Sequence, residues 1–124
     1  MDDAVKESYL QVEAVAKDIH ERLQAEVNKL GFGIDEVQLK EPFEAWYRLE
    51  PDPASGKKAL KGDWIDEKGA KLGSLVFNID GSFFVEQDIV RPHPKKPGWF
   101  VEAVNAWGRE GIIKAEAKLL RMPE

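Results

Sequence analysis

The stretch LVFNIDGSFFVEQDIV, residues 75–90, decides the fold because it contains two alternating segments joined by a tight turn. Side chains that alternate between apolar and polar are typical of half-buried strands. A two-residue turn would pair Phe77 with Phe84 and would mix the two faces. A three-residue loop closed by Gly81 pairs Phe77 with Phe83 instead and keeps one face apolar. The stretch therefore predicts an antiparallel hairpin in this second register.

This register separates the side chains of the hairpin into two faces. The first face is apolar and contains Leu75, Phe77, Phe83, Val85 and Ile89. The second face is mixed and contains Val76, Asn78, Phe84, Glu86 and Asp88. If Gly69 closes the preceding hairpin in the same way, Trp64 lies opposite Leu72 on the second face. Trp46 is expected there too, because Tyr47 and its apolar neighbours occupy the opposite side of their strand.

The N-terminal part of the chain, residues 3–30, carries a helical pattern. Apolar side chains recur there at steps of three and four, namely Val5, Tyr9, Val12, Ala16, Ile19, Leu23, Val27 and Leu30. Gly31 is placed to end this helix. At a rise of about 1.5 Å per residue the helix is roughly 40 Å long, whereas a compact domain of this size is about 35 Å across. We therefore expect its N-terminal turns to overhang the domain.

The C-terminal third of the chain carries two further patterns. Residues 99–107 predict a short helix, because the apolar side chains fall on one helical face; these are Trp99, Phe100, Ala103, Val104 and Trp107. Residues 112–120 fit a helix or a strand, and their alternation slightly favours a strand.

These elements together predict a single α+β domain over residues 1–124. A long N-terminal helix and a shorter C-terminal helix are expected to pack on a five- or six-stranded antiparallel sheet of hairpins. No pattern of strand, helix and strand suggests a parallel crossover, so a parallel sheet is disfavoured.

The composition restricts the class of protein. The chain has 124 residues, of which 43% are hydrophobic and 33% charged, which excludes a disordered chain. With a net charge of −5, nucleic acids and anionic membranes are disfavoured as partners. The acidic opening MDDAVKE differs from a secretory leader, and there is no cysteine, so we expect a cytoplasmic location.

The second face of the predicted sheet is the main candidate site. We expect it to bind a partner or ligand through Trp46, Trp64, Val76, Phe84, Glu86 and Asp88. In the competing interpretation, another element covers these aromatic side chains as ordinary core. Glu86 and Asp88 would stand about 6.5–7 Å apart on a strand, near the lower limit for the carboxylates of inverting glycosidases. Alternating acids are common on solvated strands, however, and no catalytic residue is assigned.

A second candidate is the basic stretch RPHPKKPGW, residues 91–99. Its side chains precede the helix expected from Gly98, whose free amides would favour an anion. The candidate anion-binding residues are Arg91, His93, Lys95 and Lys96. The competing interpretation is a stiff proline-rich connector. With two histidines and no cysteine in the chain, we expect no metal site, and no motif indicates a cofactor.

Two classes of function remain open. The favoured class is an interaction protein that uses the aromatic sheet face or the N-terminal helix, because no catalytic signature is present. In that class the overhanging helix predicts a homodimer through Val5, Tyr9 and Leu10. The alternative is a small-molecule-binding protein or small enzyme with a pocket between sheet and helices, in which Glu86 and Asp88 act.

Overall fold

The helix predicted at the N-terminus is present as α1 (Asp3–Lys29) in the computed structural model, which describes residues 2–123. Asp2 caps it, because its side chain accepts a hydrogen bond from the amide of Val5 at 2.9 Å. Leu30 caps the C-terminal end of the helix, and Gly31 follows it with a φ of 104°, a conformation that suits glycine. Within residues 2–123, no helix combines the length and apolar composition that a membrane span requires.

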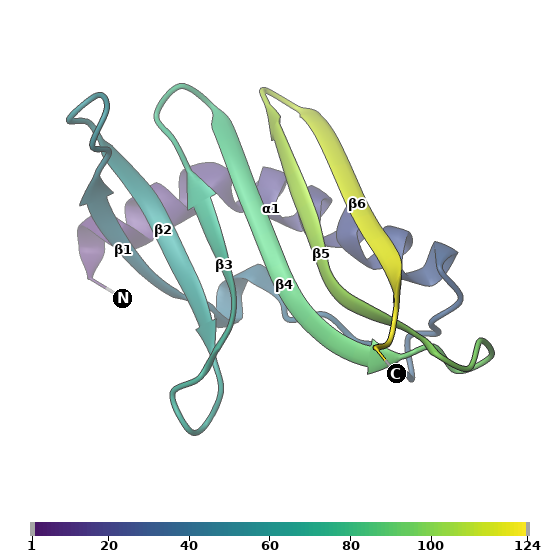
Figure 1. Ribbon diagram of the computed structural model, residues 1–124. Helices are drawn as coiled ribbons and strands as arrows, with labels where there is room; N and C mark the ends of the chain where they lie inside the picture. The colour runs from purple at the N-terminus through teal and green to yellow at the C-terminus, as the bar shows by residue number, and fades with distance from the viewer. Residues whose placement is uncertain (1, 124) are drawn as a thin grey trace.

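Six antiparallel strands follow α1 in simple hairpin order. They are β1 (Trp46–Pro51), β2 (Lys58–Ile65), β3 (Lys71–Phe77), β4 (Ser82–Pro92), β5 (Trp99–Arg109) and β6 (Ile112–Arg121). Each strand pairs with the next, and α1 crosses one face of the sheet behind all six (Figure 1). The predicted α+β class with an antiparallel sheet is confirmed. A short 3-10 turn, η1 (Pro42–Glu44), precedes β1.

The hairpin of β3 and β4 has the predicted register. Phe77 pairs with Phe83, and Leu75 pairs with Val85. These four side chains are buried toward α1, so the face assignment made from the alternation is confirmed.

The predicted helix over residues 99–107 is wrong, because this segment is β5. A β-bulge between Val101 and Val104 adds a residue to β5 relative to β6, which shifts the alternation by one position. Val101, Val104 and Ala106 all face the core. Trp107, which the helical pattern placed on the same face as Val104, instead pairs with Phe84 on the opposite side of the sheet. The strand favoured for the C-terminal tail is confirmed as β6.

A second bulge overturns the placement of Trp64. The turn after β2 pairs Ile65 with Lys71 as Gly69 requires, but Trp64 then pairs with Gly73 rather than Leu72. The extra residue moves Trp64 to the covered face, where it is 2% exposed. Its indole N–H donates to the carbonyl oxygen of Glu41 at 2.9 Å, which satisfies the one polar group of the buried ring.

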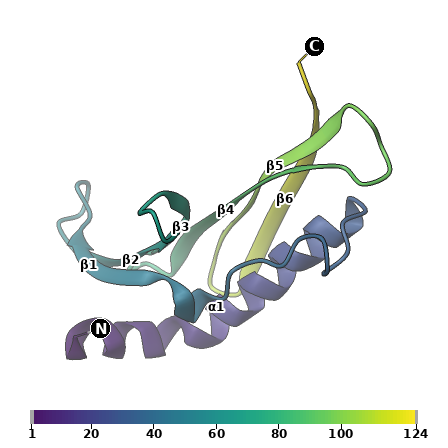
Figure 2. The same cartoon turned by 90° about the horizontal axis from the view of Figure 1, so that it is seen from below.

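The segment between α1 and η1 runs back along the helix (Figure 2) and is held by two glutamine side chains. Gln24 of α1 donates to the Val37 carbonyl oxygen at 3.1 Å and accepts from the Leu39 amide at 3.2 Å. Gln87 of β4 accepts from the Lys40 amide at 2.8 Å and donates to the Lys40 carbonyl oxygen at 2.9 Å. The two side-chain amides thus replace the backbone ladder that this segment lacks.

The predicted overhang of α1 does not expose its apolar side chains. Val5 and Tyr9 are buried, and the Tyr9 ring lies 4.9 Å from that of Tyr47 in β1, centroid to centroid. The estimate from a sphere was wrong because the strands lie side by side along the helix (Figure 1). Leu10 alone of the three predicted dimer residues is exposed, at 57%. Two of the three residues predicted to form the homodimer interface are therefore buried within this chain.

Candidate functional site

The face of the sheet opposite α1 is covered by no other element among residues 2–123 (Figures 1 and 2). Val76, Phe84 and Trp107 pair directly across β3, β4 and β5 on this face. Cross-strand neighbours of this kind lie within contact distance. Phe84 is 43% exposed and Trp107 is 37% exposed. We refer to these three side chains as the aromatic row.

The β1 side of the uncovered face carries a network of ion pairs. Arg48 binds Glu50 and Asp63, the latter at 2.6 Å. Lys61 lies 3.4 Å from Glu50, and Lys71 lies 3.2 Å from Asp63. Burial opposes ionisation of Asp63, but hydrogen bonds from Arg48 and Lys71 outweigh it and lower the pKa of that carboxyl. The charges on this side therefore largely satisfy one another.

Glu86 and Asp88 follow Phe84 along β4 and share its face. They lie opposite Asn105 and Ala103 of β5. Among residues 2–123, neither carboxylate has a cationic side chain within 4.0 Å. An acid and base pair needs a cleft that raises one pKa, whereas this face is open. The two carboxylates are placed to attract a cationic group.

The structure brings most of the predicted face residues together. The uncovered face holds Trp46, Val76, Phe84, Glu86 and Asp88. Trp64 was wrongly included, because the extra residue in β3 places it on the covered face. Trp107 was missed, because the segment was assigned to a helix. The signal that indicates its face is the alternation in the last part of β5, where Val104 and Ala106 are buried between exposed or half-buried neighbours.

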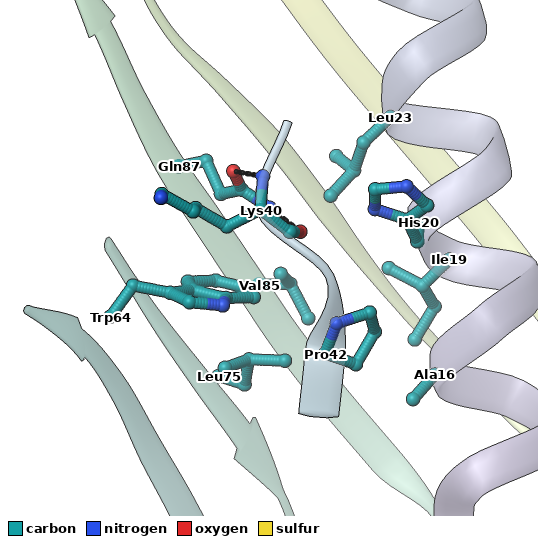
Figure 3. A pocket seen from close by; sticks show the side chains of 10 residues that line it. All are labelled: Ala16, Ile19, His20, Leu23, Lys40, Pro42, Trp64, Leu75, Val85 and Gln87. Carbon is teal, nitrogen blue, oxygen red and sulfur yellow. Dashed lines mark hydrogen bonds between the residues drawn. The ribbon is translucent and has the colours of Figure 1, made fainter. Parts of the chain in front are cut away.

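The space between sheet and helix is filled by side chains (Figure 3). It is lined by Ala16, Ile19, His20, Leu23, Lys40, Pro42, Trp64, Leu75, Val85 and Gln87. The gap among them is too small to admit a water molecule. Glu86 and Asp88 do not line this gap, although Asp88 lines a separate open hollow of about 250 Å³ with Lys40 and Leu72. Among residues 2–123, no group of three or more histidine, cysteine or acidic side chains is placed to bind a metal.

The predicted anion-binding residues are only partly available. His93 is buried, its Nε2 lies 2.6 Å from the Leu30 carbonyl oxygen, and its Nδ1 accepts from the Lys95 amide at 3.0 Å. Nε2 therefore attaches the loop after β4 to the end of α1, and Nδ1 binds a backbone amide of that same loop. The helix expected from Gly98 is β5, so its free amides are absent from this site. Arg91, Lys95 and Lys96 remain exposed.

Comparison with known proteins adds no functional residue. The chain matches no protein-family model, no curated protein and no solved structure. The candidate site is therefore defined by its geometry, which is an exposed aromatic row beside two carboxylates on a six-stranded sheet. Such an arrangement can bind another surface.

Proposed function

We propose that this protein is a protein-binding domain whose partner lies on the uncovered sheet face, over the aromatic row. The observation that supports the proposal is the exposure of Phe84 and Trp107 side by side on a face that no element among residues 2–123 covers. Aromatic side chains dominate the binding energy of protein interfaces. Removing each large side chain from water contributes about 1.5–3 kcal/mol.

The charges on this face indicate the chemistry of the partner. The cations near β1 are already paired, whereas Glu86 and Asp88 are not engaged by another side chain of residues 2–123. A partner that presents apolar side chains beside a lysine or arginine would cover the aromatic row and pair with these carboxylates. The proposed partner is therefore a protein with a basic, partly apolar surface.

Site-specific cross-linking tests this proposal. Benzoylphenylalanine at position 84 should capture a protein in the source cell, which mass spectrometry identifies. The matched control carries the same group at position 43, because Phe43 is exposed in η1, away from the sheet face. We expect capture from position 84 only. Equal capture from both positions, or capture from neither, contradicts the proposal.

The captured partner, once purified, allows a second measurement. Trp107→Ser and Glu86→Lys should each weaken its binding by about tenfold or more in calorimetry. Phe43→Ser should leave the affinity unchanged, since Phe43 is exposed away from the aromatic row. Because Trp107 and Glu86 are partly buried, denaturation curves check that each variant is folded before the affinities are compared. Unchanged binding by Trp107→Ser and Glu86→Lys would show that the partner binds elsewhere.

A further inference from the structure

A second exposed apolar region lies at the far end of β4 and β5. It is an open groove of about 280 Å³, lined by Val90, Arg91, Pro92, Phe100, Met122 and Pro123. Val90 is exposed in the bulge between Asp88 and Arg91, with φ of 48°, a conformation that is rare for a β-branched residue. The amide of Met122 donates to the carbonyl oxygen of Gly98 at 2.8 Å, which places Met122 beside the loop that joins β4 to β5.

Positive charge is concentrated around this groove. Arg91 lines it, and Lys95 and Lys96 belong to the loop to which Met122 is bonded. Arg121 pairs with Trp99 and lies over its ring, 5.9 Å from the centroid, on the side of the sheet opposite Phe100 and Met122. Neither Arg91 nor the two lysines have a carboxylate within 4.0 Å among residues 2–123.

The charge of the whole chain makes this concentration significant. The net charge is −5, so the side chains other than Arg91, Lys95 and Lys96 sum to −8. The groove therefore presents the opposite charge to the rest of the molecule, and it also presents the opposite charge to Glu86 and Asp88 beside the aromatic row.

We propose that this groove binds a short acidic segment of another protein, with one bulky apolar side chain in the groove and its carboxylates on Arg91, Lys95 and Lys96. A volume of about 280 Å³ lies below the range of about 300–1,000 Å³ that is usual for small-molecule sites, and the groove is open, which suits a single side chain. Three separate cations match several carboxylates along a segment better than a single charge.

A membrane surface fits the observations less well. The side chains other than Arg91, Lys95 and Lys96 carry a net charge of −8, which an anionic lipid layer would repel. The acidic segment goes beyond the proposed function, because it concerns a different surface with the opposite charge preference.

An NMR titration of the labelled full chain tests the inference. The probe is a pentapeptide with blocked ends that carries phenylalanine between two pairs of acidic residues. We expect shifts centred on the amides of Val90, Phe100 and Met122, with a dissociation constant of about 0.1–1 mM. Salt raised from about 50 to about 500 mM should weaken binding severalfold. The same peptide with serine at its centre should bind at least about tenfold more weakly.

Variants separate a specific site from general attraction. Arg91→Glu with Lys95→Glu should weaken binding about tenfold or more, and Val90→Asn should weaken it while suiting the backbone at that position. Lys57→Glu with Lys58→Glu makes the same change in net charge near the far β1–β2 turn and should have little effect. Denaturation curves check that each variant is folded.

Several outcomes would overturn the inference. Shifts that spread over the molecule, equal binding of the serine peptide, or equal weakening by the Lys57 and Lys58 changes would indicate non-specific attraction. Absence of shifts at about 2 mM peptide would exclude a site for this chemistry. If vesicles with about one quarter phosphatidylserine bind the protein and the peptide does not, the groove is a membrane contact instead.

Discussion

Single buried polar side chains determine how the segments of this protein are held together. Tyr47 is an example, because its hydroxyl donates to the carbonyl oxygen of Pro42 at 2.7 Å and ties β1 to η1. Its ring also packs against that of Tyr9 in α1. Burial first, and then the proximity of Tyr9, raises the pKa of the Tyr47 hydroxyl well above its ordinary value.

This shift predicts a loss of stability in alkali. The folded protein holds the phenol proton more tightly than the unfolded chain does, so the contribution is complete below the unfolded pKa of about 10 and is lost as the pH rises above it. The free energy of unfolding should fall by up to about 1.4 kcal/mol per pH unit there on account of this group. Urea denaturation of the wild type and of Tyr47→Phe between about pH 8 and pH 11.5 measures the difference. The Phe variant should fall less steeply, and parallel curves would contradict this account.

At the scale of elements, β-bulges decide which side chains face the helix. The extra residue in β3 brings Gly73 opposite Trp64. A Cβ atom at position 73 would lie 2.3 Å from the carbonyl oxygen of Glu86 and 3.1 Å from the Trp64 ring. Only a residue without a side chain permits this close approach.

Gly73→Ala should therefore disturb the pairing of β3 with β4 and the packing of Trp64. We expect a loss of about 2–4 kcal/mol in the free energy of unfolding, together with a change in tryptophan fluorescence. Ser74→Ala is the control, because Ser74 faces away from the helix and its change should cost less than about 0.5 kcal/mol. Equal stability of the two variants would show that the backbone relaxes around the new methyl group.

At the scale of the whole molecule, α1 crosses all six strands and its N-terminal half packs against the β1 side of the sheet (Figure 1). Val5 and Tyr9 consequently belong to the core of this chain. A homodimer through the helix would need these same side chains, so its predicted interface competes with the fold.

The two roles of these residues give different results on substitution. Val5→Asp with Tyr9→Glu should unfold the protein or cost at least about 4 kcal/mol, because two charges would be buried. Leu10→Asp should change the free energy of unfolding by less than about 0.5 kcal/mol, since Leu10 is exposed. Thermal unfolding and sedimentation of the wild type, the double variant and Leu10→Asp distinguish a core role from a dimer role. If the wild type is a dimer and the double variant is a stable monomer, the predicted dimer interface along α1 is supported instead.

Much of the candidate site follows from local pattern. Alternation in residues 75–90 places Phe84, Glu86 and Asp88 on one face, because the side-chain period of a strand is a property of the backbone. The same pattern, with Gly81, determines the pairing of Phe77 with Phe83. The site beyond this hairpin depends on neighbouring strands. Trp107 joins Phe84 only through the pairing of β4 with β5.

The sequence by itself determined the helix of α1, the β3–β4 register and the alternation that β6 follows, since each rests on a period carried by adjacent residues. The tertiary structure alone decided the face of Trp64, the strand at β5 and the burial of Val5, Tyr9 and His93. The physical reason is that a bulge inserts one residue relative to a partner strand, and burial requires a second surface. A bulge and the burial of a side chain both depend on residues that are distant in sequence, so a local repeat of apolar residues cannot predict them.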